Sequence, residues 1–365
     1  MARHPCANTI VAANDGLRGA GRHSVPEESH LIVHHHRKPL ADGNFSVEAY
    51  FDTVRTHLGP NVAVRVAPFV SRGIWRRVGN IVSCALRRAG VHHITGDISY
   101  IALLLPRRYT ILTVLDCGFE EDSHRIRREL RRLLWYAVPV RCCAIVTVIS
   151  DFTRERLLAN VDCEPSKVRV VPVCVSPRFR RKDRPFNSAK PTILQIGTAE
   201  NKNLLRLCTA IAGMKCHLHI VGRLSSPQVE ALSSAGIEYS SSRRLSAAEM
   251  VLAYENCDLV SFASTYEGFG MPIIEANVVG RPVVAGNVAA MPDTAGDAAC
   301  LVDPFDPASI RNGIERVVND LPYRENLVSN GFRNAERFSA QRVADLYQSI
   351  YSELVTLQSH SRVGR

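Results

Sequence analysis

The segment LVSFASTYEGFGMPIIEANVVG, residues 259–280, decides the fold of this chain. Its first six residues form a short, mostly apolar run that is typical of a buried parallel strand. Pro272 suits the first position of a helix, and Gly280 is placed to end that helix. The segment therefore predicts a strand, a glycine-rich turn and a helix, which together form the repeating unit of a parallel α/β sheet.

Two glutamates flank the turn, Glu267 after the strand and Glu275 near the helix start. Open α/β sheets bind ligands at the carboxyl ends of their strands. The glycines at 268 and 270 leave room for backbone N–H groups which, with the helix dipole, favour an anion or hydroxyl groups. Either glutamate alone would be read as a solvated loop residue or a partner of the helix dipole. Their combination with the glycines indicates a ligand site.

The same alternation of strand and helix extends in both directions from this segment. Apolar runs rich in Val and Ile are separated by stretches with helical periodicity, which predicts sheets covered by helices on both faces. The expected strands are residues 30–36, 62–70, 91–95, 110–116, 144–150, 168–175, 192–197, 217–222, 237–239, 259–264, 282–286 and 299–303.

A charged stretch, SPRFRRKDRPFNSAK at residues 176–190, interrupts this alternation and reads as a linker. We therefore predict the fold class α/β with two doubly wound domains and a cleft between them. The expected parts are a mobile N-terminal tail (residues 1–27), a first domain (28–177), a linker (178–190), a second domain (191–338), and a C-terminal amphipathic helix with its tail (339–365).

Composition agrees with a large folded protein that attracts anions. The 365 residues are 46% hydrophobic, which suits two domains, and the formal charge is +10. That charge fits nucleic acid, an acidic membrane surface or phosphate-bearing small molecules equally well. No run is long and apolar enough to span a membrane, and residues 1–27 lack the apolar core of a secretory signal. We expect a cytoplasmic protein, with peripheral binding at the inner face of the membrane as an option.

Cysteine and histidine usage does not predict a metal site. The eleven cysteines show no CxxC spacing, so we expect reduced thiols. The His34-His35-His36 run lies on an expected strand, where alternation sends neighbouring side chains to opposite faces. At most two of these histidines converge, and no further ligand stands at metal-binding spacing.

Residues 264–304, STYEGFGMPIIEANVVGRPVVAGNVAAMPDTAGDAACLVDP, resemble the donor-binding core of GT-B glycosyltransferases of family GT4. That core is marked by two glutamates with seven residues between them. The resemblance is weaker at ILQIGTAENKNLLRL (193–207) and faint in the first half, at VTVISDFTRERLL (146–158) and KVRVVPVCVSPRF (167–179).

This resemblance implies two Rossmann-like domains facing a cleft, with the C-terminal helix crossing back to the first domain. It also implies a retaining, hexosyltransferase-type enzyme that uses a UDP- or GDP-sugar as substrate and needs no metal or cofactor. Glu275 would hydrogen-bond the donor ribose, and Lys202 would meet the diphosphate. Glu267 and Asp116 would be the catalytic residues. The implied donor-binding set is Gly197, Thr198, Lys202, Asn203, Arg223, Gly268, Phe269, Gly270, Met271 and Glu275.

Two departures from the family pattern stand out. Relatives carry an arginine where this chain has Thr198 or Asn201. Candidate substitutes are Arg223 after the HIVG run, or Arg243 and Arg244 in SSSRRLS, and each is equally plausible as a surface charge. Relatives also carry a histidine at the position of Leu115, although Asp116 remains. On the acceptor side, His93 and Asp97 end a neighbouring strand and are alternative candidates, while a strand-end histidine is more often structural.

Several functions remain open at this stage. The favoured one is a glycosyltransferase in the synthesis of cell-surface polysaccharide or glycolipid, with an acceptor that the sequence does not identify. The main alternative is a sugar-nucleotide-binding or scaffold protein without turnover, which Leu115 and the missing arginine motivate. An epimerase of similar fold is weaker. Nucleic-acid binding is disfavoured because the basic segments lack an aromatic stacking platform.

Two basic segments, residues 71–88 and 124–143, each combine arginines with apolar residues and a tryptophan, Trp75 or Trp135. We expect helices in both, with Pro139 ending the second. They are either ordinary amphipathic helices or a surface that docks the first domain on anionic lipid. Docking of this kind would bring the cleft to a lipid-linked acceptor.

Overall fold

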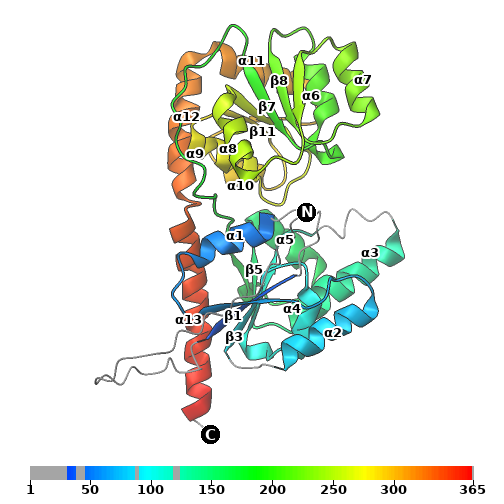
Figure 1. Cartoon of the computed structure of the whole chain (residues 1–365), viewed down its shortest axis with the longest axis vertical. Helices are drawn as coiled ribbons and strands as arrows, with labels where there is room; N and C mark the ends of the chain where they lie inside the picture. Colours follow the sequence, from blue (N-terminus) through cyan, green and yellow to red (C-terminus); the bar gives the residue numbers. More distant parts are fainter. Residues whose placement is uncertain (1–30, 38–45, 87–89, 118–123, 364–365) are drawn as a thin grey trace, which may run out of the picture.

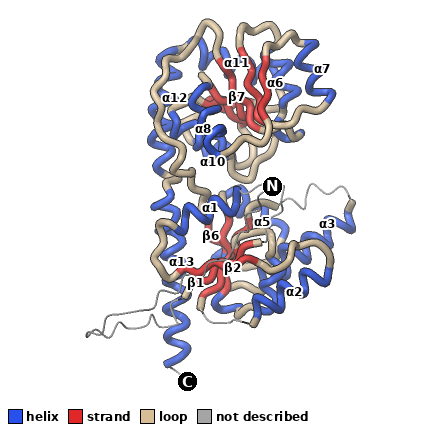
Figure 2. Tube along the Cα trace, viewed as in Figure 1, coloured by secondary structure: helices blue, strands red, loops and turns tan. Residues whose placement is uncertain are grey.

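The computed structural model describes residues 31–37, 46–86, 90–117 and 124–363. The tail predicted at residues 1–27 lies outside these ranges. The chain forms two α/β domains, each with a six-stranded parallel sheet between helices (Figures 1 and 2). This is the GT-B architecture, and the long last helix runs alongside the first domain (Figure 1).

The first domain is built on a sheet of order β2-β1-β3-β4-β5-β6. Its strands are β1 (Ile32–His36), β2 (Val62–Val66), β3 (Val91–Ile94), β4 (Thr110–Val114), β5 (Ile145–Val148) and β6 (Val168–Val170). Its helices are α1 (Ser46–Arg55), α2 (Ile74–Ala85), α3 (Arg125–Arg131), α4 (Val138–Arg141) and α5 (Asp151–Asn160), with the 3-10 helices η2 (Ser99–Leu104), η3 (Arg107–Tyr109) and η5 (Pro165–Lys167) and the π-helical turn η4 (Arg132–Ala137).

The second domain has the order β12-β11-β10-β7-β8-β9. Its strands are β7 (Thr192–Ile196), β8 (His217–Val221), β9 (Tyr239–Ser242), β10 (Leu259–Phe262), β11 (Val283–Gly286) and β12 (Cys300–Val302). Its helices are η6 (Glu200–Lys202), α6 (Leu204–Ile211), α7 (Ser226–Ser234), α8 (Ala247–Asn256), α9 (Met271–Val279), α10 (Met291–Ala295), α11 (Pro307–Asn319) and α12 (Leu321–Glu336).

Every strand expected from the sequence overlaps a strand of the structure. At the ends of α9, Gly280 caps the helix as expected, with a φ of 84°, and Pro272 is its second residue instead of the first. The expectation that Pro139 ends a helix is wrong. Pro139 lies inside α4, directly after the π-helical turn η4. The changed hydrogen-bond register of that turn accommodates a residue without an N–H group.

Helix α13 (Ala340–Val363) returns to the first domain and is fastened there by buried polar contacts. The Tyr351 hydroxyl lies 2.8 Å from Nε2 of His34 and 2.7 Å from Nδ1 of His93. His35 points to the other side of the sheet, where its Nε2 lies 3.0 Å from Nδ1 of His92. Burial lowers the pKa of His34, and it lowers that of His93 to about 3, so both rings stay neutral. The His34–His36 run is therefore part of the core.

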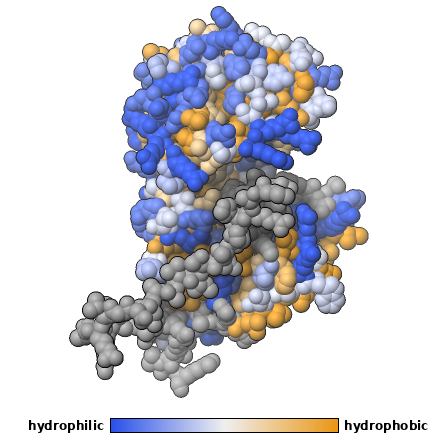
Figure 3. Space-filling model, in the orientation of Figure 1, coloured by the Kyte–Doolittle hydropathy of each residue, from blue (hydrophilic) through white to orange (hydrophobic). Residues whose placement is uncertain are grey.

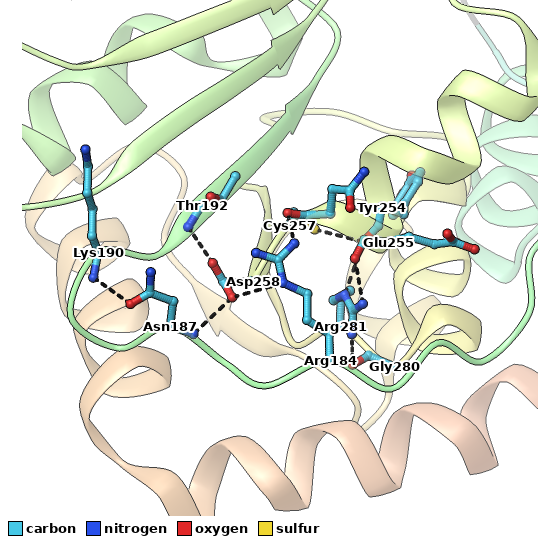
Figure 4. A network of polar contacts seen from close by, with 11 residues as sticks. Arg184, Asn187, Lys190, Thr192, Tyr254, Glu255, Cys257, Asp258, Gly280 and Arg281 are labelled. Carbon is cyan, nitrogen blue, oxygen red and sulfur yellow. Dashed lines mark hydrogen bonds and ion pairs between the residues drawn. The ribbon is translucent and has the colours of Figure 1, made fainter.

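Residues 179–190, most of the expected linker, pack against the second domain, and Figure 4 shows the part from Arg184 onward. The Asp258 carboxylate accepts hydrogen bonds from the backbone N–H groups of Asn187 (3.1 Å) and Thr192 (2.7 Å). The Arg281 guanidinium donates to the carbonyl groups of Tyr254 and Glu255. One buried apolar cluster also runs through both domains and α13. The two domains therefore share part of their core.

Two further expectations concern the thiols and the membrane. All ten cysteines within the described ranges are free thiols, as predicted, including the adjacent pair Cys142 and Cys143. In the part of the chain that the structure describes, no helix has the length and apolar character needed to cross a bilayer.

Candidate functional site

The order of the second sheet creates a topological switch point at the carboxyl ends of β7 and β10. These strands are neighbours, but the chain leaves β7 toward β8 on one side and leaves β10 toward β11 on the other. The loops that follow them therefore diverge, as at the ligand-binding switch point of an open α/β sheet. Lys202 follows β7 and Glu267 follows β10, so the topology brings these two predicted site residues together.

Lys202 and Glu267 form an ion pair in which Nζ donates to Oε1. Both side chains are largely shielded, with 22% and 14% of their surface exposed, respectively. Nζ also lies 5.0 Å from the centre of the Phe262 ring. Because a Cβ on Gly197 would come within 2.8 Å of Lys202 Cγ, only glycine lets the lysine side chain fold across the end of β7. The glycine thus positions the lysine.

A second link between the two loops comes from Asn201, which the sequence indicated only as a missing arginine. Its Nδ2 donates to the carbonyl of Tyr266 (3.0 Å) and lies 3.4 Å from Glu267 Oε1. The Asn201 carbonyl accepts from the backbone N–H of Thr265 (2.9 Å). Glu267 is therefore held by two residues of the β7 loop.

The glycine-rich turn reaches the first domain through Gly268. Its carbonyl accepts hydrogen bonds from the hydroxyls of Ser150 (2.7 Å) and Thr153 (3.2 Å), at the start of α5. A Cβ on Gly268 would lie 3.1 Å from the Leu115 carbonyl oxygen and 3.7 Å from Asp116 Cβ. The sequence did not predict these contacts, although Ser150 was recognisable as a helix cap. Gly268 is glycine because the two domains meet there.

Gly270 begins α9 with a φ of 104°, a backbone conformation that favours glycine. From this helix, Glu275 and Met271 line a pocket of about 310 Å³ between the domains, together with Phe269 of the turn. Tyr254 donates a hydrogen bond from its hydroxyl to Glu275. Burial raises the pKa of the Glu275 carboxyl to about 7, although the bond from Tyr254 opposes that shift. Glu275 is thus poised to titrate near neutral pH.

Of three other predicted donor residues, two have their side chains engaged within the protein. Asn203 is buried and donates to the carbonyls of Ala263 (2.8 Å) and Pro304 (2.6 Å), so it braces the loop. The Thr198 hydroxyl donates to the Arg223 carbonyl (2.7 Å). The Arg223 side chain is exposed beyond the end of β8. Asn203 and Thr198 therefore shape the site through the backbone.

On the first domain, the structure separates the acceptor-side candidates. His93 is fully buried, with both ring nitrogens engaged by Tyr351 and by the Thr113 hydroxyl (2.7 Å). The suggestion that it reaches the cleft is wrong, because strand alternation turns it toward α13. Asp97 and Asp116 instead line a pocket of about 510 Å³ beside Leu115. Among the described residues, no three His, Cys, Asp or Glu side chains are grouped so as to hold a metal ion.

Comparisons with known proteins bear on the second half of the chain and on the fold. Residues 177–334 match the family model of glycosyl transferases group 1. The whole fold is similar to Anabaena Alr3699/HepE in complex with UDP and glucose (TM-score 0.71, 14% identity, covering 89% of this chain and 100% of that one). It is also similar to sucrose-phosphate synthase from Thermosynechococcus elongatus (TM-score 0.70, 14% identity, covering 90% of this chain and 100% of that one). A third similar structure is WaaG, a glycosyltransferase involved in lipopolysaccharide biosynthesis (TM-score 0.61, 15% identity, covering 88% of this chain and 99% of that one). A search of curated protein sequences finds no match.

Proposed function

Since this is a GT-B protein whose residues 177–334 match the glycosyl transferases of group 1, we propose that it is a retaining, GT4-type hexosyltransferase. Its donor is a UDP- or GDP-sugar, and its acceptor belongs to cell-surface polysaccharide or glycolipid synthesis. The observation that carries this proposal is the meeting of Lys202 and Glu267 at the switch point of the second sheet, beside the glycine-rich turn.

Donor binding would rearrange the Lys202–Glu267 ion pair. The diphosphate takes the ammonium group of Lys202, which leaves Glu267 to accept hydrogen bonds from the sugar hydroxyls. The ribose hydroxyls donate to Glu275, whose orientation Tyr254 fixes. When the bond between the anomeric carbon and the diphosphate breaks, Lys202 and the N-terminus of α9 stabilise the departing negative charge. These groups supply the charge compensation of a metal-independent reaction.

A panel of nucleotides tests this proposal. We expect one nucleoside diphosphate and its hexose conjugate to raise the unfolding temperature of the protein. A ligand that binds the native state stabilises that state by mass action. UDP comes first, because the Alr3699/HepE structure contains it. Release of the nucleotide in the presence of EDTA then tests metal independence, and the anomeric configuration of the product tests retention. If no nucleotide changes the unfolding temperature, the proposal is wrong.

Leu115 favours a second candidate, a sugar-nucleotide-binding protein without turnover. This apolar residue stands where the resemblance implies histidine, and it lines both pockets described above. The same experiment separates the two functions. Tight donor binding without release of nucleotide, with or without added acceptors, would establish the second candidate.

We also propose that the first domain binds the inner face of an anionic membrane from the cytoplasm. Trp75 on α2 and Ile126 on α3 are 86% and 83% exposed, and further exposed apolar side chains lie beside them. These are Ile74, Val78, Val82, Leu86, Leu130, Leu133 and Leu134. Figure 3 shows hydrophobic residues on the lower right of this domain, where Figure 1 places α2 and α3. Trp135 is half-buried, with the Arg77 guanidinium 4.6 Å from its ring centre, so Trp75 is the residue available for headgroups.

Co-sedimentation with vesicles tests this surface. Each arginine near an anionic surface adds about 1 kcal/mol, so binding should need anionic lipid and weaken in high salt. Trp75→Ala should reduce binding, whereas Phe305→Ala should not, because that exposed aromatic residue lies on the second domain. Equal recovery in the supernatant with neutral and anionic vesicles, at low and high salt, would remove the membrane from the proposal.

A further inference from the structure

The pocket of about 510 Å³ lies at the switch point of the first sheet. β1 is paired with both β2 and β3, so the loops after β1 and β3 leave the sheet toward different sides. Arg37 follows β1 and Asp97 follows β3, and both line the pocket. Asp116, after β4, lines it as well. The first domain therefore has its own crevice of the kind that binds ligands.

Arginines reach this pocket from three separate elements. Arg37 follows the sheet, Arg77 comes from α2 and Arg131 from the end of α3. The Arg37 Nε donates to Glu48 (2.8 Å), and the Arg77 guanidinium lies against the face of Trp135. A planar guanidinium held on an aromatic face presents its edge to oxygen atoms, and one terminal nitrogen of Arg77 already donates to the Ser71 carbonyl (3.3 Å).

Two buried polar atoms of the lining lack a hydrogen-bond partner among the described residues. They are the Ser99 hydroxyl, in a residue only 8% exposed, and Nε of Arg77. Leaving such a donor unsatisfied is costly, so structures normally provide it with a partner. Both residues line the pocket, where a ligand oxygen could accept from them.

The two carboxylates of the pocket add a different requirement. Asp97 is open to the pocket, yet the surrounding protein excludes enough water to raise its pKa; Arg37 opposes that shift and Asp116 adds to it. Aspartates repel an anion but accept hydrogen bonds from hydroxyl groups. A ligand that satisfies both halves of the pocket therefore carries an anionic group beside hydroxyl groups.

We infer that this pocket binds a phosphate group attached to a polyol or sugar, and that this is the head of the acceptor. Arg77, Arg131 and Ser99 donate to the phosphate oxygens, whereas Asp97 and Asp116 accept from the hydroxyls. The inference rests on the proposed transferase function. The exposed apolar side chains of α2 and α3 adjoin the same arginines, which suits a head carried on a lipid.

The tryptophan in the pocket provides a direct reporter. The chain has two tryptophans, so in Trp75→Phe protein all tryptophan emission comes from Trp135. Glycerol 1-phosphate should change this emission with saturation, and should bind about tenfold more tightly than glycerol or inorganic phosphate. Dihexanoyl phosphatidylglycerol distinguishes a lipid-linked head from a free polyol phosphate. Tighter binding than that of glycerol 1-phosphate identifies a lipid head, and equal binding identifies a free polyol phosphate.

Variants in the same background show where the ligand binds. Arg131→Gln and Ser99→Ala should each weaken glycerol 1-phosphate binding about tenfold. Arg125→Gln should leave it unchanged, because Arg125 is exposed on the same helix outside the pocket lining. Nucleotide binding by calorimetry should be unchanged in all variants, which confirms folding and tests the donor site separately. Equal binding of glycerol, an equal loss in Arg125→Gln, or no emission change while nucleotide still binds would overturn the inference.

Discussion

The two switch points of this molecule are built in different ways. In the second domain, a continuous stretch from Glu267 to Glu275 meets a short loop that contains Lys202. In the first domain, Arg37, Arg77 and Arg131 come from separate elements. In the second site, Lys202 and Glu267 form an ion pair with each other. In the first site, the buried Ser99 hydroxyl and Arg77 Nε have no hydrogen-bond partner among the described residues.

This difference fits two kinds of ligand. A nucleoside diphosphate has a fixed pattern of charge and hydroxyl groups, which one strand–turn–helix unit can match. Acceptors vary, and loops on a rigid sheet can change one residue at a time. We therefore expect variants of the second switch point to change nucleotide binding or bond cleavage, and variants of the first to leave nucleotide binding intact.

The largest effect should come from Glu267→Gln. This change removes the carboxylate beside the reacting sugar and should lower nucleotide release from the donor by about a hundredfold or more. Affinity for the nucleoside diphosphate should not fall, because Lys202 loses its competing partner. Turnover assays and calorimetry measure the two quantities, with Glu230→Gln on the exposed face of α7 as the control. Parallel loss of affinity and turnover would show that Glu267 only supports the loop.

A smaller effect is expected where the two regions touch. Gly268→Ala places a Cβ about 3.1 Å from the Leu115 carbonyl oxygen, which must push the turn away from the first domain. A shift of a few tenths of an ångström should reduce turnover about tenfold and leave nucleotide affinity nearly unchanged. Gly59→Ala, whose Cβ meets nothing within 4 Å, is the matched control. Wild-type turnover in Gly268→Ala would mean that this contact does not position the site.

The smallest effect concerns pH and Glu275. Its pKa of about 7 lies above that of an unfolded glutamate, so this residue's contribution to stability is lost as pH rises from about 4.5 through 7. Donor affinity should instead increase with pH, because the ribose hydroxyls favour the ionised carboxylate of Glu275. UDP-glucose affinity should rise between pH 6 and 8 by at most about tenfold, and UDP-glucose lacks the terminal phosphate that titrates near pH 6. In Glu275→Gln the affinity should be flat, and an unchanged pH profile would contradict the assignment.

Much of the second domain could be predicted because its signals are local. A run of apolar residues, a proline at 272 and a glycine at 280 fix the ends of β10 and α9 without knowledge of distant residues. The switch-point pair also follows, since both residues stand just after strands. Local order does not show which strands are neighbours, so Ser150 and Thr153 as partners of Gly268 could not be predicted.

The incorrect placement of His93 has the same cause. His93 was a candidate for the cleft because it ends a strand, whereas side-chain direction decided the outcome. The side chain of Asn203, which the resemblance places in the donor-binding set, is engaged within the protein. His93 turns toward Tyr351 of α13, 258 positions away in sequence, and Asn203 adopts a φ of 62° that aims its amide at two backbone carbonyls. The arginines of the first switch point have no shared motif, so only the folded chain brings them together.

Calorimetric titration of UDP and uridine into wild-type and Lys202→Ala protein tests the central claim most directly. If Lys202 meets the diphosphate, its loss removes a charged hydrogen bond that contributes about 1.5–3 kcal/mol. UDP affinity should then fall by roughly tenfold to a hundredfold, while uridine affinity stays within about twofold. Equal losses for both ligands, or no loss for UDP, would contradict the assignment of this switch point as the donor site.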